Sequence, residues 1–325
     1  MALRPVRVIP DRASSFLPRM EENGYVDSVA VALVLVSAGM HAGWNAFGKG
    51  RVPTASFFLV ASFGGLVLLS AAPLVWSEVT AEYERRDVML VVTAGFFEAV
   101  YLSALAGGYR IGDLSLVYPL ARALPAVTVT IGSVVLGRSD SISTLCWVGA
   151  ILIVLGCVLL PQARFADLRI ATYRSRAFLL ALLAAAGTTG YSLVDDQALR
   201  YLRSEHPSLH PGGVTSVYSF FQVLATAGWL SLLVFSRRTG RASFRLALKD
   251  WRQVTFTGVV ITLTYLIVLV ALAFVRDVSY VVAFRQVSIP MGALLGVLVF
   301  QEPMPLPKLV GLMVIGTGLV LVSVG

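Results

Sequence analysis

Residues 115–137 read SLVYPLARALPAVTVTIGSVVLG, an apolar stretch long enough to cross a ~30 Å hydrocarbon core as a helix. Similar stretches recur along the whole chain. Of its 325 residues 57% are hydrophobic and only 14% are charged, and the mean hydropathy is +0.80. A soluble domain usually carries roughly 25% charged residues. The charge present is therefore too sparse to cover a water-facing surface, and the composition predicts an integral membrane protein.

Ten apolar blocks separated by polar connectors predict an all-α protein with ten membrane-spanning helices. The connectors RIGD (110–113) and VRD (275–277) are so short that consecutive helices must be antiparallel. A re-entrant segment is the alternative for block 54–76. Residues 1–26 form a polar tail without the apolar core of a cleavable signal peptide. The predicted spans are 27–48, 54–76, 87–109, 113–136, 142–161, 176–196, 213–235, 253–275, 278–300 and 306–324.

The two halves of the chain repeat each other. Residues 101–138 align without gaps to residues 265–302. Five spans in each half is an odd number, so the halves 27–161 and 176–324 must enter the membrane from opposite sides. This is the inverted repeat of many secondary transporters. The polar and aromatic matches that support the alignment are Tyr101 with Tyr265, Asp113 with Asp277, and Ser115 with Ser279.

Three segments resemble the EamA-type transporters of the drug/metabolite transporter superfamily: HAGWNAFGKG (41–50), the stretch 115–137, and VVAFRQVSIPMGALLGVLVFQEPM (281–304). The resemblance covers both halves. It implies two five-helix EamA repeats that export or exchange small metabolites, with no cofactor and no ATP-binding subunit. The family usually has glutamate at the end of the fourth span of each repeat. Here the second repeat keeps Glu302, whereas the first has Arg138.

The net charge of +8 comes from basic residues that lie almost entirely in the connectors. Anionic lipid headgroups would meet them there, so the expected partners are the lipid bilayer and a small solute, not nucleic acid. Protons are the candidate coupling ion, and the chain is expected to be a monomer or homodimer in a prokaryotic inner membrane. The family pattern puts both termini in the cytoplasm, although connectors 162–175 and 236–252 place more basic residues on the other side.

The first span carries a polar and aromatic stripe. His41, Trp44 and Asn45 fall at i, i+3 and i+4 on one helix face. The stripe is predicted to be the wall of a solute cavity. The alternative is that Asn45 and His41 form hydrogen bonds with a neighbouring helix. Lys49, at the end of the span, is expected to anchor in the headgroups.

Deep charges in the other spans suggest a solute path, because an ionisable group costs roughly 2.5–3.5 kcal/mol at the centre of a membrane. Glu98 is a candidate proton carrier, and a salt bridge to Arg122 is the alternative. Arg122 and Arg285 suit an anionic or zwitterionic solute, since a guanidinium binds carboxylate or phosphate with two hydrogen bonds. Pairing with Glu98, Asp195 or a backbone carbonyl is the alternative for each arginine. Asp195 is a second candidate proton carrier.

The remaining predicted lining is aromatic or polar and neutral: Tyr101, Tyr118, Tyr191, Gln222, Tyr265 and Gln286. Asp113 stands at the start of a span, where a helix cap is expected. Spans 142–161 and 306–324 are nearly free of polar groups and rich in glycine. They are predicted to be packing helices at the periphery or at a dimer seam.

A membrane enzyme is the competing class of protein. An intramembrane hydrolase needs an activated nucleophile or a metal cluster. The chain has three histidines and no HExxH, GxSxG or phosphate-binding motif. The sequence therefore favours a secondary transporter that works by alternating access. An intramembrane enzyme or a non-transporting scaffold is the alternative.

Overall fold

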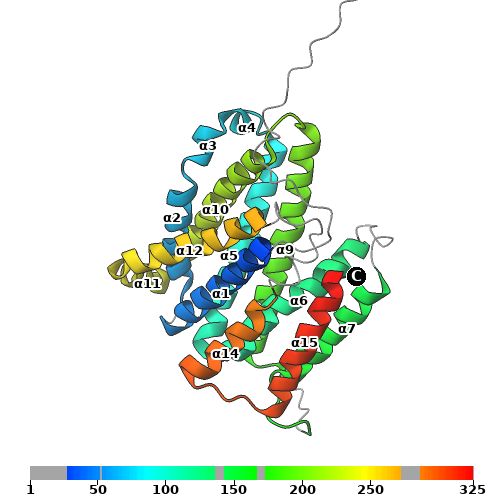
Figure 1. Ribbon diagram of the computed structural model, residues 1–325. Helices are drawn as coiled ribbons and strands as arrows, with labels where there is room; N and C mark the ends of the chain where they lie inside the picture. Colours follow the sequence, from blue (N-terminus) through cyan, green and yellow to red (C-terminus); the bar gives the residue numbers. More distant parts are fainter. Residues whose placement is uncertain (1–27, 52, 136–142, 167–172, 272–285, 325) are drawn as a thin grey trace, which may run out of the picture.

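The computed structural model describes residues 28–51, 53–135, 143–166, 173–271 and 286–324 (Figure 1). Every regular element in these ranges is a helix. In chain order the elements are α1 (Ser28–Gly50), α2 (Ala55–Leu69), α3 (Ala72–Val75), α4 (Ser77–Ala81), α5 (Arg85–Ile111), α6 (Leu114–Val135), α7 (Thr144–Leu159), α9 (Arg176–Glu205), α10 (Pro211–Phe235), α11 (Arg238–Lys249), α12 (Trp251–Ala271), α14 (Ser288–Phe300) and α15 (Leu306–Val324).

Seven helical segments in the described ranges are long and apolar enough to cross a membrane. They lie in α1, in α2 together with α3, and in α5, α9, α10, α12 and α15. Shorter apolar segments, Leu114–Thr128 of α6 together with α7 and α14, lie within the remaining predicted spans, although part of span 278–300 falls outside the described residues. The arrangement is compatible with a multi-pass integral membrane protein.

Several helices begin at residues suited to capping. The Thr54 side chain accepts a hydrogen bond of 3.1 Å from the Phe57 amide at the start of α2. Ser143 and Ser175 accept the same kind of bond at the starts of α7 and α9. Pro211 occupies the first turn of α10, where its missing N–H costs nothing. These caps satisfy amides that would otherwise lack partners at the membrane boundary.

Some predicted connectors contain more helix than expected. Residues 236–252 hold α11, and α9 continues to Glu205 although its predicted span ends at 196. The polar residues in these segments lie on the surface of helices that leave the apolar layer. Low hydropathy marks where the apolar layer ends, and it does not mark where the helix ends.

The helices pack in pairs that join distant parts of the sequence. α5 contacts α9 and α10, α2 contacts α10 and α12, and α1 contacts α12 and α14. α6 packs against α9 and α14. Figure 1 shows α7 (green) and α15 (red) side by side, away from α11 at the opposite edge of the molecule.

The contact between α7 and α15, here called the α7–α15 seam, brings backbone against backbone at four glycines. A Cβ atom on Gly149 would lie 2.5 Å from the carbonyl oxygen of Gly318. A Cβ on Gly156 would lie 2.6 Å from the carbonyl oxygen of Gly311. No larger residue fits these positions without moving a helix. The glycines of the two predicted packing helices thus meet within one chain.

α6 contains two prolines, Pro119 and Pro125. Proline has no backbone N–H, so the carbonyl groups of Ser115 and Ala121, four residues earlier, lose their helical donors. The helix nevertheless continues through both prolines because its flanks are buried against α9 and α14.

Candidate functional site

A cavity of about 630 Å³ lies among helices α1, α2, α5, α6, α9, α10 and α12, and the start of α14 also reaches it. Its wall combines aromatic rings, hydroxyl groups, carboxylates and one guanidinium. The predicted site residues that line it are His41, Trp44, Glu98, Tyr101, Arg122, Tyr191, Asp195, Gln222, Tyr265 and Gln286.

Two of the predicted site residues that the structure describes, Asn45 and Tyr118, are not in this wall. Asn45 is fully buried; its Oδ1 accepts a hydrogen bond of 2.6 Å from the Tyr109 hydroxyl, and its Nδ2 donates to the His41 carbonyl at 2.7 Å. It therefore joins α1 to α5, as the alternative interpretation proposes. Tyr118 is buried with its ring 6.1 Å from the His41 ring. Arg285 lies outside the described residues.

The two cavity carboxylates have neutral hydrogen-bond partners. Glu98 accepts a hydrogen bond of 2.8 Å from the Thr226 hydroxyl. Asp195 accepts one of 2.7 Å from the Tyr218 hydroxyl and further ones of 3.2 Å from the Gln222 amide. In the described part of the chain neither carboxylate forms an ion pair with an arginine. The predicted alternatives of salt bridges from Glu98 or Asp195 to Arg122 are not present in this conformation.

Arg122 places a guanidinium in the cavity wall without a carboxylate partner among the described residues. Its Nε atom is buried and has no hydrogen-bond partner there. The indole Nε1 of Trp44 and the Oε1 of Gln286 are buried without partners in the same ranges. A buried polar atom without a partner costs roughly 1–3 kcal/mol. A polar solute in the cavity would supply the missing partners.

Aromatic contacts hold the cavity wall together. The His41 and Trp44 rings meet edge to face with centroids 5.1 Å apart, and Trp44 meets Phe58 at 6.3 Å. Across the cavity wall, Tyr101 on α5 meets Tyr191 on α9 at 6.0 Å. Such pairs add about 0.5–1.5 kcal/mol beyond the area they bury. They give the site flat apolar surfaces beside its charged groups.

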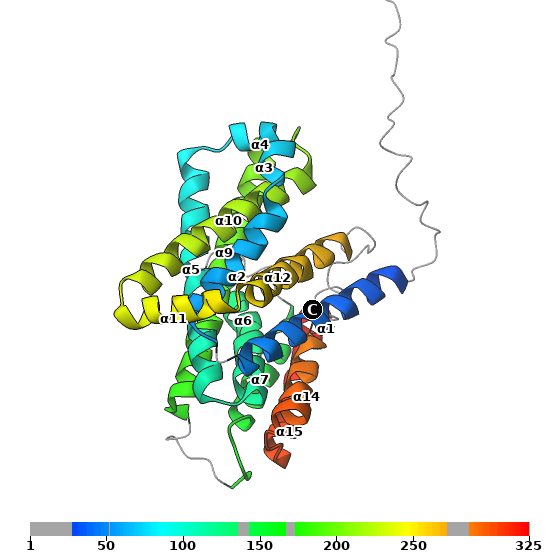
Figure 2. The same ribbon diagram turned by 90° about the vertical axis from the view of Figure 1, so that its left-hand side faces the viewer.

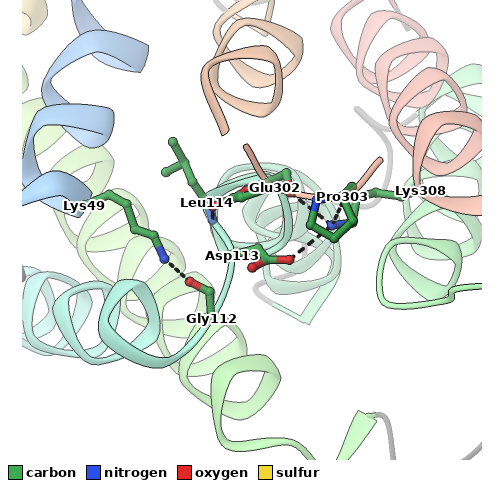
Figure 3. A network of polar contacts seen from close by, with 8 residues as sticks. Lys49, Gly112, Asp113, Leu114, Glu302, Pro303 and Lys308 are labelled. Atoms are coloured by element: carbon green, nitrogen blue, oxygen red, sulfur yellow. Dashed lines mark hydrogen bonds and ion pairs between the residues drawn. The ribbon is translucent and has the colours of Figure 1, made fainter. Parts of the chain in front are cut away.

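A second polar group surrounds the turn between α5 and α6 (Figure 3). Both carboxylate oxygens of Glu302 accept hydrogen bonds from the first amides of α6, at 2.6 Å from Leu114 and 2.8 Å from Ser115. Asp113 is therefore not the side-chain cap predicted for this helix. Its backbone position leaves the amides aimed at Glu302, which reaches them after Gln301 turns the chain at a positive φ of 53°.

Two lysines complete this group of residues, which we call the α5–α6 turn network: Lys49, Asp113, Ser115, Glu302 and Lys308. Lys308 is buried and donates to the Ser115 hydroxyl at 3.1 Å and the Pro303 carbonyl at 3.0 Å, and it lies 3.4 Å from the Asp113 carboxylate. Lys49 donates to the carbonyl groups that end α5, including that of Gly112 (Figure 3). The prediction that Lys49 anchors in the headgroups is wrong, because free carbonyls at a helix end attract a cation more specifically.

The sequence reasoning missed many small hydroxyl residues in the cavity wall. Ser219, Gln222 and Thr226 fall at i, i+3 and i+7 on α10, so their spacing already marks one face. A single serine or threonine in an apolar helix can also donate a hydrogen bond to the backbone of its own helix. Its presence in the sequence therefore does not by itself indicate a cavity. The other missed residues are Ser37, Ser62, Thr130, Ser192, Asp196, Thr262, Thr264 and Ser288.

The fold and the cavity together define a class: an all-helical protein, compatible with a multi-pass membrane protein, with a polar cavity among apolar helices. Within the described ranges no cluster of histidine, cysteine, aspartate or glutamate is arranged to hold a metal ion. No protein-family model matches the chain, and no curated protein shows significant similarity to it. The likeness to EamA-type transporters rests on the three quoted segments alone.

Proposed function

We propose that the chain is a secondary active transporter of the drug/metabolite type, which moves a small metabolite across a prokaryotic inner membrane by alternating access. The observation that carries this proposal is the cavity in which unpaired Arg122 shares one wall with Glu98 and Asp195. The solute is a zwitterion or an organic anion, such as an amino acid, or an amphiphile with an aromatic or apolar part.

The separation of charges in the cavity supports a solute site over a structural role. A structural ion pair would bring Arg122 against Glu98 or Asp195, because each charge costs a few kcal/mol in the membrane when it is alone. Instead hydroxyl and amide groups hold the two carboxylates. The guanidinium is left for a solute carboxylate or phosphate.

Helix packing supports ten spans arranged as an inverted repeat. Taken in chain order, the apolar helices α1, α2, α5, α6 and α7 of the first half correspond to α9, α10, α12, α14 and α15 of the second. Exchanging the halves turns the α5–α9 contact into the α12–α1 contact, and α6–α9 into α14–α1. The α5–α10 contact becomes α12–α2, and the pairs α2–α10, α6–α14 and α7–α15 become themselves. Packing with this symmetry is expected of two related halves.

The glycines of the α7–α15 seam repeat the same relation at single residues. After a two-residue deletion the sequence alignment continues into the next span, where Gly149 corresponds to Gly311 and Gly156 to Gly318. The close approach of Gly149 to Gly318 therefore becomes that of Gly311 to Gly156 when the halves are exchanged, and both are present. A pseudo-two-fold axis between α7 and α15 accounts for this reciprocity.

The α5–α6 turn network supplies a closed side for the transport cycle. It joins a turn of the first half, at Asp113 and Ser115, to Glu302 and Lys308 of the second half. Rocking the halves apart would separate these partners and admit water there. In this conformation they are joined, and we assign the network to the closed side of the proposed cycle.

A thermal-shift screen of the purified protein against metabolite pools, followed by uptake of each stabilising compound into proteoliposomes, tests the transport proposal. We expect at least one compound to stabilise the protein and to enter protein-containing vesicles in a saturable manner. If no stabilising compound enters faster than into protein-free vesicles, transport is not the function of this cavity.

Proton coupling is tested separately with Glu98→Gln, which keeps the side-chain shape and the contact with Thr226. We expect uptake driven by a pH gradient to be lost while exchange of solute across the membrane continues. Asp195→Asn serves as the parallel variant for the second candidate. If both variants keep gradient-driven uptake, neither carboxyl carries the coupled proton.

A further inference from the structure

Helix α11 lies between α10 and α12 at the edge of the molecule in both views (Figures 1 and 2). One face of the helix rests on the protein. Phe244 meets Phe235 at the end of α10 with ring centroids 5.1 Å apart. The hydroxyl of Ser56, near the start of α2, donates to the carbonyl of Gly240 at 3.1 Å. These contacts fix the helix where three apolar helices begin or end.

A different face of α11 carries a stripe of positive charge. Arg238, Arg241, Arg245 and Lys249 recur at spacings of three or four residues, which places them along one side of the helix. All four side chains are exposed. In the described ranges none of them has an acidic partner or a side-chain hydrogen bond. We name these four residues the basic stripe.

Exposed apolar groups flank the basic stripe. Leu246 and Leu248 lie on its two sides and are 61% and 43% exposed. Trp251, the first residue of α12, is 52% exposed and has the Arg252 guanidinium over its ring at 5.6 Å. Tryptophan and arginine are typical of the boundary between headgroups and acyl chains. A helix with leucines beside arginines has the composition of an element that lies in the plane of a membrane surface.

We propose that the basic stripe of α11 binds the anionic headgroups of the surrounding phospholipids and fixes this end of the bundle in the interface. The partner is a lipid phosphate surface because the four charges are uncompensated by the protein. The flanking leucines need an apolar neighbour, which a free phosphate ion cannot provide. The lipids are held by charge and by apolar contact together, independently of the solute in the cavity.

The test uses the full-length protein in nanodiscs of phosphatidylcholine alone or of phosphatidylcholine mixed with phosphatidylglycerol. We expect the anionic lipid to raise the unfolding temperature, and added salt to reduce this increase by screening. Replacing Arg241 and Arg245 with glutamine should remove about half of the increase, since two of four similar charges are lost. Replacing all four basic residues with glutamine should remove all of it.

Two matched variants separate the headgroup effect from general changes. Arg241→Lys with Arg245→Lys keeps both charges and should keep the increase. Arg85→Gln with Arg86→Gln removes the same charge from the start of α5 and should also keep it. Inorganic phosphate added to phosphatidylcholine nanodiscs should give no comparable stabilisation.

Three results would overturn the proposal. The first is an unfolding temperature of the unmodified protein that does not depend on phosphatidylglycerol. The second is an equal loss of the increase in the α5 variant and in the α11 variant. The third is full stabilisation by inorganic phosphate, which would assign the basic stripe to a soluble anion.

Discussion

The α7–α15 seam and the cavity both lie between apolar helices, and they differ in whether the groups that meet there have partners within the chain. At the seam the glycine backbones touch and the neighbouring groups are apolar, so the contact is complete within the chain. In the cavity wall the Arg122 and Trp44 nitrogens and the Gln286 oxygen are buried without partners in the described ranges. The polar groups of the cavity wall are therefore those that the proposed solute would bind.

This difference separates two meanings of an unusual residue in a membrane helix. A glycine at the seam is required by shape, and its replacement should reduce stability before it affects transport. A charge in the cavity wall reduces stability, and its removal should affect transport first. Substitutions in the two regions should therefore give opposite patterns of stability and activity.

The largest expected effect is at the seam. Gly156→Leu should lower stability by more than about 3 kcal/mol or prevent folding, because backbone and Ile315 atoms occupy the space for its side chain. Thermal unfolding in detergent measures the loss. Gly316→Leu, on α15 but with open space at its Cβ position, is the control. Equal unfolding temperatures for the two variants would show that the helices do not meet at these glycines.

The second effect is at the cavity. Arg122→Gln should weaken binding of the solute found in the thermal-shift screen by roughly 10- to 100-fold, the value of a hydrogen bond to a charged group. The unfolding temperature of the free protein should stay the same or rise. Arg110→Gln, at an exposed position near the end of α5, should change neither property. A loss of stability in the Arg122 variant, with unchanged binding, would make Arg122 a structural residue.

The third effect concerns the α5–α6 turn network, where polar groups are structural. Glu302→Gln should cost about 2 kcal/mol, because two charge-assisted hydrogen bonds to the start of α6 become weaker ones. Urea or thermal unfolding measures this cost. Glu205→Gln, exposed at the end of α9, is the matched control and should be close to neutral. Equal behaviour of the two glutamates would contradict a capping role.

The smallest effect is at the link between α1 and α5. Tyr109→Phe removes the donor to Asn45 and should cost ~1 kcal/mol in unfolding free energy. Tyr201→Phe is the control, since that hydroxyl has no hydrogen bond in the part of the chain that is described. Unchanged solute binding in the Tyr109 variant would place Asn45 outside the transport path. Weaker binding at full stability would return it to the cavity.

The helices were predictable from the sequence because hydropathy reports the membrane directly. Each of the ten apolar helices in the described ranges overlaps a predicted span, and the glycine-rich spans do pack closely. The extent of the polar helices was not predictable from hydropathy. α11 and the last turns of α9 lie where the sequence is charged, and helical spacing is the only signal there.

The cavity was only partly predictable. The spacing of polar residues shows which of them share a helix face, but it does not show what that face contacts. The stripe at His41 and Trp44 turns toward the cavity, whereas adjacent Asn45 turns to Tyr109. From the sequence, Glu302 stood out only because the matching position of the first repeat is Arg138. Its contact with the Leu114 amide joins residues far apart in sequence, which no local pattern reveals.

The two prolines of α6 have a mechanical consequence. Arg122 lies between Pro119 and Pro125, in the part of the helix where two rungs of the backbone ladder are missing. The start of that helix is held by the two hydrogen bonds to Glu302. A helix bends most easily where proline removes its backbone hydrogen bonds. A small bend at these prolines would move the Arg122 guanidinium relative to α5 and α9.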